Sequence, residues 1–184
     1  MSRTHYRTSL PHLDGPIHQM ITYRLADSLP LKTLNLAPKN TPAYRQYIER
    51  QLDAGYGSCL LKIPSIATAI LNNWQYFHGQ RYRLLGGVIM PNHVHVLIEV
   101  IDDVSLTTIV HSWKTWSGKH IREYLTANGI QYPPGIWQRD YWDRYIRSQQ
   151  HLDAAMRYIQ ENPLKAGLVD HAEDWPWKVN SPLE

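Results

Sequence analysis

The stretch Met90-Pro91-Asn92-His93-Val94-His95-Val96-Leu97-Ile98-Glu99-Val100 places a tight turn directly before a predicted strand. Residues two apart on a strand point to the same face, so His93 and His95 share one face and the intervening apolar residues point to the other. Two neutral imidazoles on one face are able to hold a single metal ion. The stretch therefore predicts a strand with a packed side and a candidate metal site on its opposite side.

The flanking segments predict an antiparallel sheet. The strand 93–100 follows another strand, 82–89, so the turn at 90–92 makes the two a hairpin. A further strand is predicted at 17–25, and a short strand is expected near the aromatic segment Trp137–Arg147. Helices are predicted at 41–54, 64–79, 105–126 and 149–161, the last ending at Asn162-Pro163. This order indicates an α+β, ferredoxin-like fold, with helices packed on one face of an antiparallel β-sheet.

Length and composition limit the class of protein. The 184 residues, 43% of them hydrophobic, predict one compact domain over residues 17–177, with an irregular N-terminal arm over 1–16 and a C-terminal tail over 178–184. The sequence has neither a run of apolar residues long enough to span a membrane nor the pattern of a secretory signal, so we expect a soluble, cytoplasmic protein. A lone cysteine, Cys59, excludes an internal disulfide and is expected to be buried.

Charge and aromatic content leave the partner open. The net charge of +3 is mildly basic, and seven Trp and twelve Tyr accompany a single Phe. Aromatic side chains among arginines and lysines are typical of proteins that bind single-stranded nucleic acid, but they are equally typical of a half-exposed core.

The candidate chemistry centres on the two histidines. No further Cys or His lies at the short spacing of a structural zinc site, so the pair indicates an open, catalytic metal site. Asp102 and Asp103 precede a helix and are explained more simply by its positive N-terminal end. A tyrosine hydroxyl is a nucleophile able to attack phosphorus, and the tyrosine-rich segment 141–147 offers the main candidates, with Tyr158 outside it. Phosphate-binding glycine loops and serine-esterase motifs are absent from the sequence.

Four segments in their order and spacing resemble the REP-associated tyrosine transposases, relatives of the single-strand transposases of the HUH single-tyrosine class. They are Val88–Leu97, His111–Lys114, Trp137–Arg147 and Tyr158–Leu168, and Trp175-Pro176-Trp177 fits the tail of that family. The resemblance covers most of the chain from about Ile17 to Trp177. It is far more specific as a combination than any one segment.

The resemblance implies a metal-dependent nuclease and strand transferase acting on single-stranded DNA folded into palindromic hairpins. His93 and His95 would bind Mg²⁺ or Mn²⁺, and Tyr141 would attack phosphorus, form a 5′-phosphotyrosine and free a 3′ hydroxyl. In the insertion-sequence relatives a glutamine four residues after the tyrosine helps to bind the metal. Here that position is Tyr145, which leaves the third ligand open, with Asp143 as a candidate.

The expected phosphate contacts are basic side chains on the long helix and near the predicted nucleophile: Lys114, Lys119, Arg122, Arg139, Arg144 and Arg147. Trp116 and Trp142 are candidates for stacking on unpaired bases. An alternative function is a catalytically inactive protein that binds DNA hairpins and marks repeats. An RNA-binding module is a third alternative. A nucleoid-associated monomer or homodimer fits the resemblance, and the sequence does not choose between the two oligomeric states.

Overall fold

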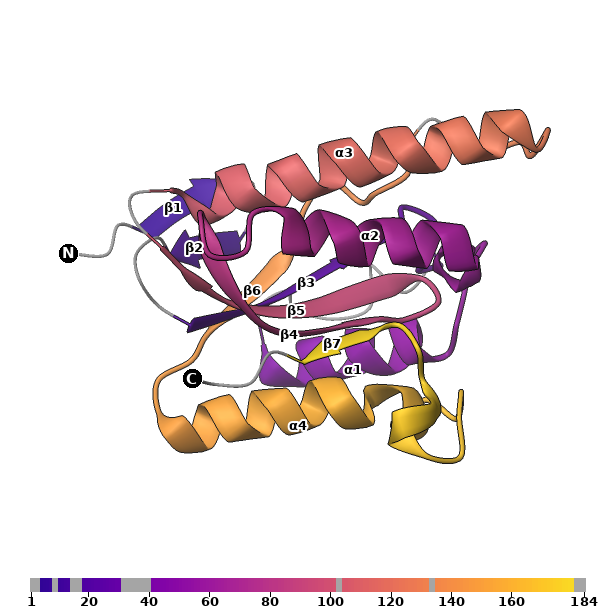
Figure 1. Ribbon diagram of the computed structural model, residues 1–184. Helices are drawn as coiled ribbons and strands as arrows, with labels where there is room; N and C mark the ends of the chain where they lie inside the picture. The colour runs from indigo at the N-terminus through magenta and orange to yellow at the C-terminus, as the bar shows by residue number, and fades with distance from the viewer. Residues whose placement is uncertain are drawn as a thin grey trace.

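The computed structural model describes residues 4–7, 10–13, 18–30, 41–101, 104–132 and 135–180. Its centre is a five-stranded antiparallel sheet in the order β6-β3-β5-β4-β7 (Figure 1). The strands are β3 (His18–Arg24), β4 (Tyr82–Ile89), β5 (His93–Val100), β6 (Trp142–Tyr145) and β7 (Lys178–Asn180). A separate antiparallel pair is formed by β1 (Thr4–Arg7) and β2 (Leu10–Leu13).

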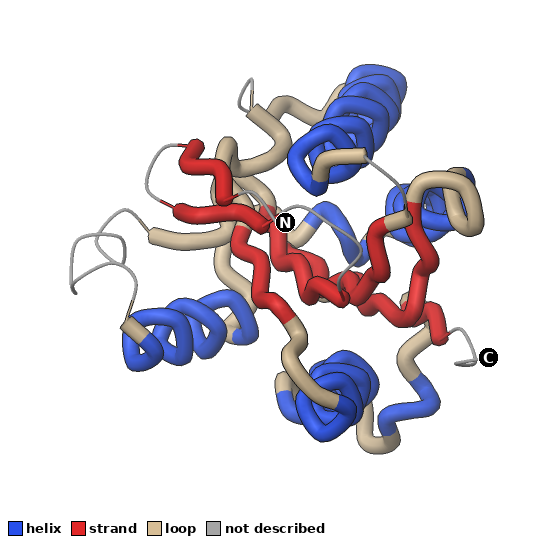
Figure 2. The backbone as a smooth tube through the Cα atoms, turned by 90° about the vertical axis from the view of Figure 1, so that its left-hand side faces the viewer, coloured by secondary structure: helices blue, strands red, loops and turns tan. Residues whose placement is uncertain are grey.

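Helices cover both faces of the sheet. Figure 2 shows two of them on one side, α2 (Pro64–Tyr76) and α3 (Leu106–Ala127), and two on the other, α1 (Pro42–Asp53) and α4 (Gln149–Lys165). Single 3-10 turns lie at η2 (Leu60–Lys62) and η3 (Ala172–Asp174). The predicted α+β class and antiparallel sheet are confirmed. The predicted layer of helices on one face corresponds to α2 and α3. The opposite face carries a second layer, α1 and α4, which the sequence does not predict.

The second layer follows from the central strand. The side chains of Val94, Val96 and Ile98 join the main core beneath α2 and α3. Leu97 points the other way, into a smaller cluster with Leu152, Ala155 and Ile159 of α4. Because β5 directs apolar side chains to both faces of the sheet, both faces are covered by helices.

Several of the tryptophans and tyrosines belong to the main core. The indole of Trp74 donates to the Tyr23 hydroxyl at 2.9 Å, and the indole of Trp113 donates to the Tyr82 hydroxyl at 2.9 Å. The Tyr82 hydroxyl in turn donates to the Trp74 carbonyl at 2.6 Å. Because these polar tips are paired with one another, the large side chains are buried without unpaired donors.

Local signals place most element ends where the sequence predicts them. Both strands of the hairpin have the predicted bounds, and the side chains of Thr41 and Ser105 cap α1 and α3 by accepting backbone N–H bonds. The last helix is longer than predicted, because Pro163 lies inside α4 and the helix continues to Lys165. A proline in the final turn removes a single donor, and the bond from the Ala166 N–H to the Asn162 carbonyl still closes that turn.

The terminal segments contain more regular structure than predicted. Lys178–Asn180, assigned to the tail by the sequence, pairs with β4 as the edge strand β7. Part of the predicted irregular arm forms the β1–β2 pair. Asp102 and Asp103 lie outside the described residues. None of the described helices is both long and apolar enough to cross a membrane.

We expect Gly87→Ala to destabilise the fold by about 1–3 kcal/mol, because a methyl group there would overpack the core. A Cβ at Gly87 would lie 2.8 Å from Cζ3 of the fully buried Trp74. Gly118→Ala is the matched control, since its Cβ would meet nothing closer than 3.4 Å, and alanine is the better helix former. Urea denaturation measures both free energies of unfolding. Equal stability of Gly87→Ala and the parent chain would contradict the expected overlap.

Candidate active site

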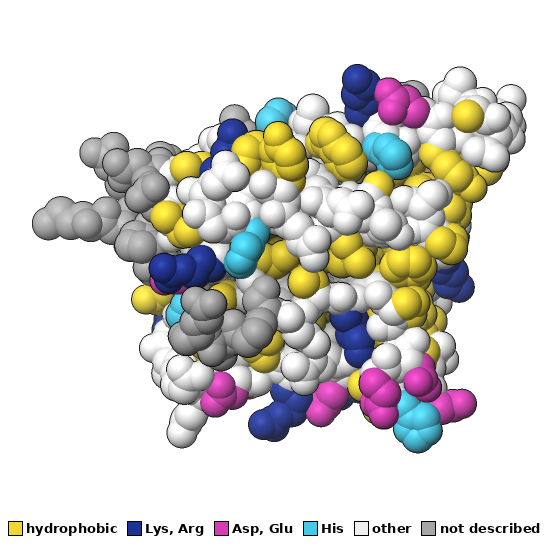
Figure 3. Space-filling model, viewed as in Figure 1, with side chains coloured by type: hydrophobic (Ala, Val, Ile, Leu, Met, Phe, Trp, Pro, Cys, Tyr) yellow, Lys and Arg dark blue, Asp and Glu magenta, His cyan; other side chains and the backbone are white. Residues whose placement is uncertain are grey.

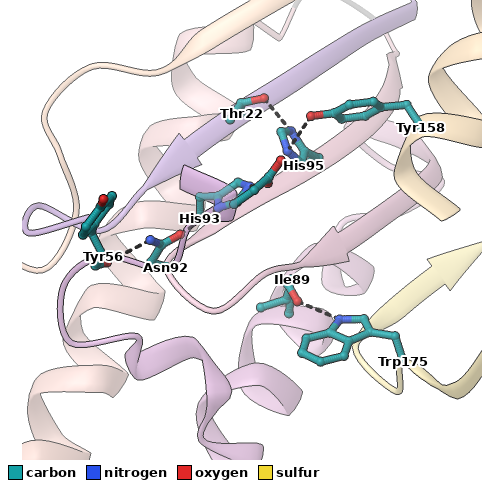
Figure 4. Close-up of polar contacts among 9 residues, drawn as sticks. Thr22, Tyr56, Ile89, Asn92, His93, His95, Tyr158 and Trp175 are labelled. Atoms are coloured by element: carbon teal, nitrogen blue, oxygen red, sulfur yellow. Dashed lines mark hydrogen bonds and ion pairs between the residues drawn. The ribbon is translucent and has the colours of Figure 1, made fainter. Parts of the chain in front are cut away.

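His93 and His95 lie side by side on β5, on the face covered by α1 and α4. Both are buried, with 1% and 0% of their surfaces exposed, and their ring centroids are 4.9 Å apart. The His95 Nδ1 is 2.7 Å from the Thr22 hydroxyl of β3, and the His93 Nδ1 is 2.8 Å from the Asn92 side-chain oxygen (Figure 4). The amide oxygen of Asn92 is an acceptor, so the His93 Nδ1 carries the proton and its Nε2 presents a lone pair.

Burial keeps both imidazoles neutral. Desolvation lowers the pKa of His93 well below its ordinary value, and the neighbouring His95 and Arg24 act in the same direction. Desolvation also lowers the pKa of His95, to about 3, with Arg144 contributing. A neutral imidazole is the form that binds metal ions.

A tyrosine from α4 completes this face. The Tyr158 hydroxyl lies 3.4 Å from the His95 Nε2, and Figure 4 shows the phenol pointing from α4 toward the imidazole. Burial raises the pKa of Tyr158 far above its ordinary value, and the nearby Glu49 and Asp53 raise it further. The hydroxyl is therefore protonated at neutral pH.

Asn162 follows Tyr158 by four residues, so the two lie on one face of α4. Its side chain is 2% exposed, and its Oδ1 has no hydrogen-bond partner. A hydrogen bond from the Asn162 side chain opposes the rise in the Tyr158 pKa. An unpaired buried amide oxygen costs free energy unless a ligand uses it.

These residues fit a divalent metal. The Nε2 of His93 is buried and lacks a hydrogen-bond partner, as is typical of a metal ligand whose other ring nitrogen is held by a second residue. In the described part of the chain, no cluster of three or more His, Cys, Asp or Glu is placed to hold a metal. A metal held by the imidazole pair would need an oxygen ligand as well, and the buried, unpaired Oδ1 of Asn162 is a candidate.

Two acidic residues of α1 face the same site. The Asp53 Oδ1 is 3.7 Å from the His93 Nε2, but the imidazole is neutral, so this contact is not an ion pair. Burial raises the pKa of Asp53 to about 6, with the negative charge of Glu49 adding to the rise. Burial also raises the pKa of Glu49 itself. Asp53 and Glu49 thus form a partly buried acidic surface next to the histidines.

The structure does not bring Tyr141 to the histidines. Tyr141 is 7% exposed and belongs to the main core on the α2–α3 face, where its hydroxyl lies 3.4 Å from the Thr107 hydroxyl. Asp143 and Tyr145 of β6 pair with Ile21 and Gln19 of β3, whereas Thr22, whose side chain lies on the histidine face, pairs with Trp142. Strand alternation therefore directs both side chains away from the histidine face.

The predicted DNA contacts divide into separate groups. Arg144 is exposed on β6, where it lines a cavity beside Tyr158. Its positive charge contributes to the lowered pKa of His95. Lys114 instead donates to the carbonyls of Gln138 and Arg139 at 2.7 Å, so it holds that loop in place. Lys119 and Arg122 are exposed on α3, while Arg139 and Arg147 are exposed outside the helices. On the face in Figure 3, basic side chains are scattered among acidic and apolar ones.

Comparison with known protein families decides the relationship. A family model described as "Transposase IS200 like" matches residues 68–162, which is 95 of the 184 residues and includes His93, His95, Tyr158 and Asn162. The chain belongs to the IS200-like transposase family. The predicted resemblance is therefore confirmed, and the family match extends through most of α4, to Asn162.

Two curated relatives of this IS200-like transposase carry more specific names. A "Putative REP-associated tyrosine transposase" of Haemophilus influenzae is 28% identical over 94 residues, covering 48% of this chain and 53% of the relative. A "REP-associated tyrosine transposase" of Escherichia coli K12 is 30% identical over 95 residues, covering 50% of each. The chain spans about half the length of the curated relatives it matches.

A solved structure shares the fold of the IS200-like transposase described above. It is a REP-associated tyrosine transposase bound to a REP hairpin, with a TM-score of 0.52 and 18% sequence identity. The match covers 96% of this chain and 82% of the other. At this identity the likeness shows the common α+β architecture.

The buried histidines predict a pH-dependent stability in metal-free buffer. The folded pKa of His95 is about 3, against 6.5 ordinarily, so the unfolded chain takes up a proton first as the pH falls. One such histidine removes about 2 kcal/mol of stability between pH 6.5 and about pH 5. Asp53 opposes this loss, since its folded pKa of about 6 lies above its ordinary 3.8.

We therefore expect His95→Gln to flatten the fall in the free energy of unfolding below pH 6.5, and Asp53→Asn to steepen it. Urea denaturation in the presence of EDTA at several pH values measures both slopes. His111→Gln is the control, because His111 is exposed on α3. An unchanged slope in His95→Gln would mean that His95 is not held neutral in the folded state.

Proposed function

We propose that the protein is a metal-dependent nuclease and strand transferase that acts on single-stranded DNA folded into palindromic hairpins, with Tyr158 as its nucleophile. The observation that carries the proposal is the position of the Tyr158 hydroxyl, which lies 3.4 Å from the His95 Nε2. His95 and its neighbour His93 are both buried and neutral. Membership of a transposase family supports DNA as the substrate. The relative bound to a REP hairpin supports a folded repeat as the form of that DNA.

The metal ligands in this proposal are His93 and His95 through Nε2 and Asn162 through Oδ1. Asn162 stands four residues after Tyr158, the spacing at which the insertion-sequence relatives carry a ligating glutamine. An amide oxygen and phosphate oxygens suit Mg²⁺ or Mn²⁺ better than two imidazoles alone. When bound, the metal supplies polarisation of the scissile phosphate and neutralises charge on its oxygens.

Within this site Tyr158 forms a phosphorus–oxygen bond in line with the bond to the leaving 3′ oxygen. The phenol proton balances the alcohol that is released, leaving a 5′-phosphotyrosine and a free 3′ hydroxyl. Since the phosphotyrosine is again a phosphodiester, a 3′ hydroxyl is able to reverse the attack and join strands. Burial of the phenol explains why it requires a cationic neighbour to react, because its own pKa is raised.

The competing function is a protein that binds DNA hairpins without cutting them. The sequence favours it through the missing metal ligand at Tyr145, whereas the present proposal assigns that role to the buried amide of Asn162. The deciding experiment incubates the protein with a stem–loop oligonucleotide carrying single-stranded flanks, with and without Mn²⁺, and resolves covalent adducts on a denaturing gel. A Mn²⁺-dependent adduct is expected. A shifted complex on a native gel with no adduct would favour the binding protein.

A further inference from the structure

The last residue of α1 stands where a carboxylate is locally unfavourable. Asp53 lies at the C-terminal end of the helix, which carries the negative end of the helix dipole. Glu49 lies four residues before it and adds a second negative charge on the same side of α1. The Asp53 Oδ1 is nevertheless buried, and it has no hydrogen-bond partner among the residues that the structure describes. Departures of this kind from local rules are expected where a functional site requires them.

The Asp53 Oδ1 faces an atom of β5 that is also unpaired. It lies 3.7 Å from the His93 Nε2, which is buried and lacks a partner within the same described ranges. Since the His93 proton is on Nδ1, both facing atoms present lone pairs, and 3.7 Å is too long for a hydrogen bond between them. Two buried acceptors that face each other require a proton donor or a cation close to both.

The chain after Asp53 fixes this arrangement. The Tyr56 carbonyl accepts a hydrogen bond of 2.9 Å from the Asn92 side-chain nitrogen, and the Asn92 oxygen accepts from the His93 Nδ1 at 2.8 Å (Figure 4). The end of α1 and the residues that follow it thus approach His93 from both of its ring nitrogens. The position of the carboxylate relative to the imidazole is therefore set by the fold.

We propose that Asp53 accepts a hydrogen bond from a water molecule on the bound metal ion, and that this contact couples metal binding to the docking of α1. The inference rests on the proposed function, which places the metal on His93, His95 and Asn162. Because no group of three His, Cys, Asp or Glu in the described ranges is placed to hold a metal, the carboxylate acts through water and not as a direct ligand. Magnesium and manganese ions favour octahedral coordination, and Mg²⁺ keeps several waters, so three protein ligands leave positions for water.

Coupling to α1 matters because this helix forms part of the surface around Tyr158. Ile48, Glu49 and Leu52 of α1 line the same cavity as Tyr158. The apolar contacts of α1 form a small cluster of Leu29, Tyr44, Ile48 and Leu52, with Tyr47 and Trp142 packed against it. A second attachment at Asp53, made when the metal is bound, should therefore reduce the local opening of α1.

The first test measures Mn²⁺ affinity in the absence of DNA, by electron paramagnetic resonance of the free ion. Asp53→Ala should lower the affinity about 10–100-fold, the usual cost of losing a group that holds a metal ligand in place. Glu49→Ala is the matched control, because it removes the same charge from the same helix one turn earlier. Its effect should be clearly smaller, since only the charge is lost and no contact with metal-bound water.

The second test measures amide hydrogen exchange of α1, with and without saturating Mn²⁺. In the wild-type protein Mn²⁺ should slow exchange in the peptides of α1. In Asp53→Ala, at a concentration that saturates this variant, α1 should exchange as it does without metal. A carboxylate with a purely structural role would instead change the exchange of α1 in the metal-free protein and leave its response to Mn²⁺ intact.

His95→Ala separates failure of this inference from failure of the proposed function. Weaker Mn²⁺ binding in His95→Ala with unchanged binding in Asp53→Ala would overturn the inference alone, and the two acceptors would then share a water molecule without a metal. Equal losses in Asp53→Ala and Glu49→Ala, or metal-dependent protection of α1 that persists in Asp53→Ala, would overturn it as well. Unchanged affinity in all three variants would refute the metal site itself.

Discussion

Tyr158→Phe is expected to abolish covalent adducts with hairpin DNA, reducing strand cleavage by about 10⁴-fold or more, as loss of an essential nucleophile does. The phenyl ring keeps the packing of α4 and removes only the hydroxyl that lies 3.4 Å from His95. Hairpin binding should remain within a few-fold of wild type, since the hydroxyl is one group among many contacts. Denaturing gels measure the adduct, and fluorescence anisotropy measures the binding.

Tyr141→Phe is the matched comparison, because Tyr141 is the nucleophile that the sequence predicts. Its hydroxyl contacts Thr107 on the opposite face of the sheet, so the variant should cut DNA at close to the wild-type rate. Loss of adducts in Tyr141→Phe, with Tyr158→Phe still active, would reverse the assignment. A tryptic peptide map of the trapped adduct identifies the linked tyrosine directly.

Removal of either kind of metal ligand is expected to weaken Mn²⁺ binding strongly. His95→Ala should lower the affinity by about 100-fold or more, because losing even an outer-shell partner of a ligand costs 10–100-fold. Electron paramagnetic resonance of free Mn²⁺ measures this affinity without any DNA. His111→Ala, which removes an exposed imidazole from α3, should leave the affinity unchanged.

Asn162 allows a sharper test of the oxygen ligand. Asn162→Leu should reduce Mn²⁺ affinity, whereas Asn162→Asp should keep or increase it, because carboxylate oxygen is a preferred ligand of hard cations. A purely structural asparagine would give a different result, with both variants losing stability and neither changing metal affinity selectively. Thermal denaturation of the metal-free variants separates these two outcomes.

The fold was predictable where side-chain alternation alone decides it. The hairpin of β4 and β5 was predicted with the observed bounds, because Val94, Val96 and Ile98 alternate with the histidines over a short, well-marked stretch. The second helical layer was harder to predict from the sequence. Leu97 is one apolar residue among several on β5, and only the docking of α4 shows that it faces a second cluster.

The proposal of Tyr158 as the nucleophile required the tertiary structure. Local composition favours Tyr141, which stands in a segment dense in aromatic and arginine residues. The structure shows instead that Tyr141 belongs to the main core and that the residues after it form the edge strand β6. One signal was present in the sequence, namely that Asn162, just after the predicted helix 149–161, follows Tyr158 by four residues. Assigning the helix end to Asn162-Pro163 obscured it.

The histidines stand on β5, the middle strand of the sheet, which is hydrogen-bonded along both edges and covered on both faces. Tyr158 stands on α4, which is attached to that sheet mainly through the apolar side chains of Leu152, Ala155 and Ile159. The two halves of the site therefore differ in stiffness. In the proposed mechanism, we expect α4 to adjust to the DNA strand while the two histidines on β5 keep their positions.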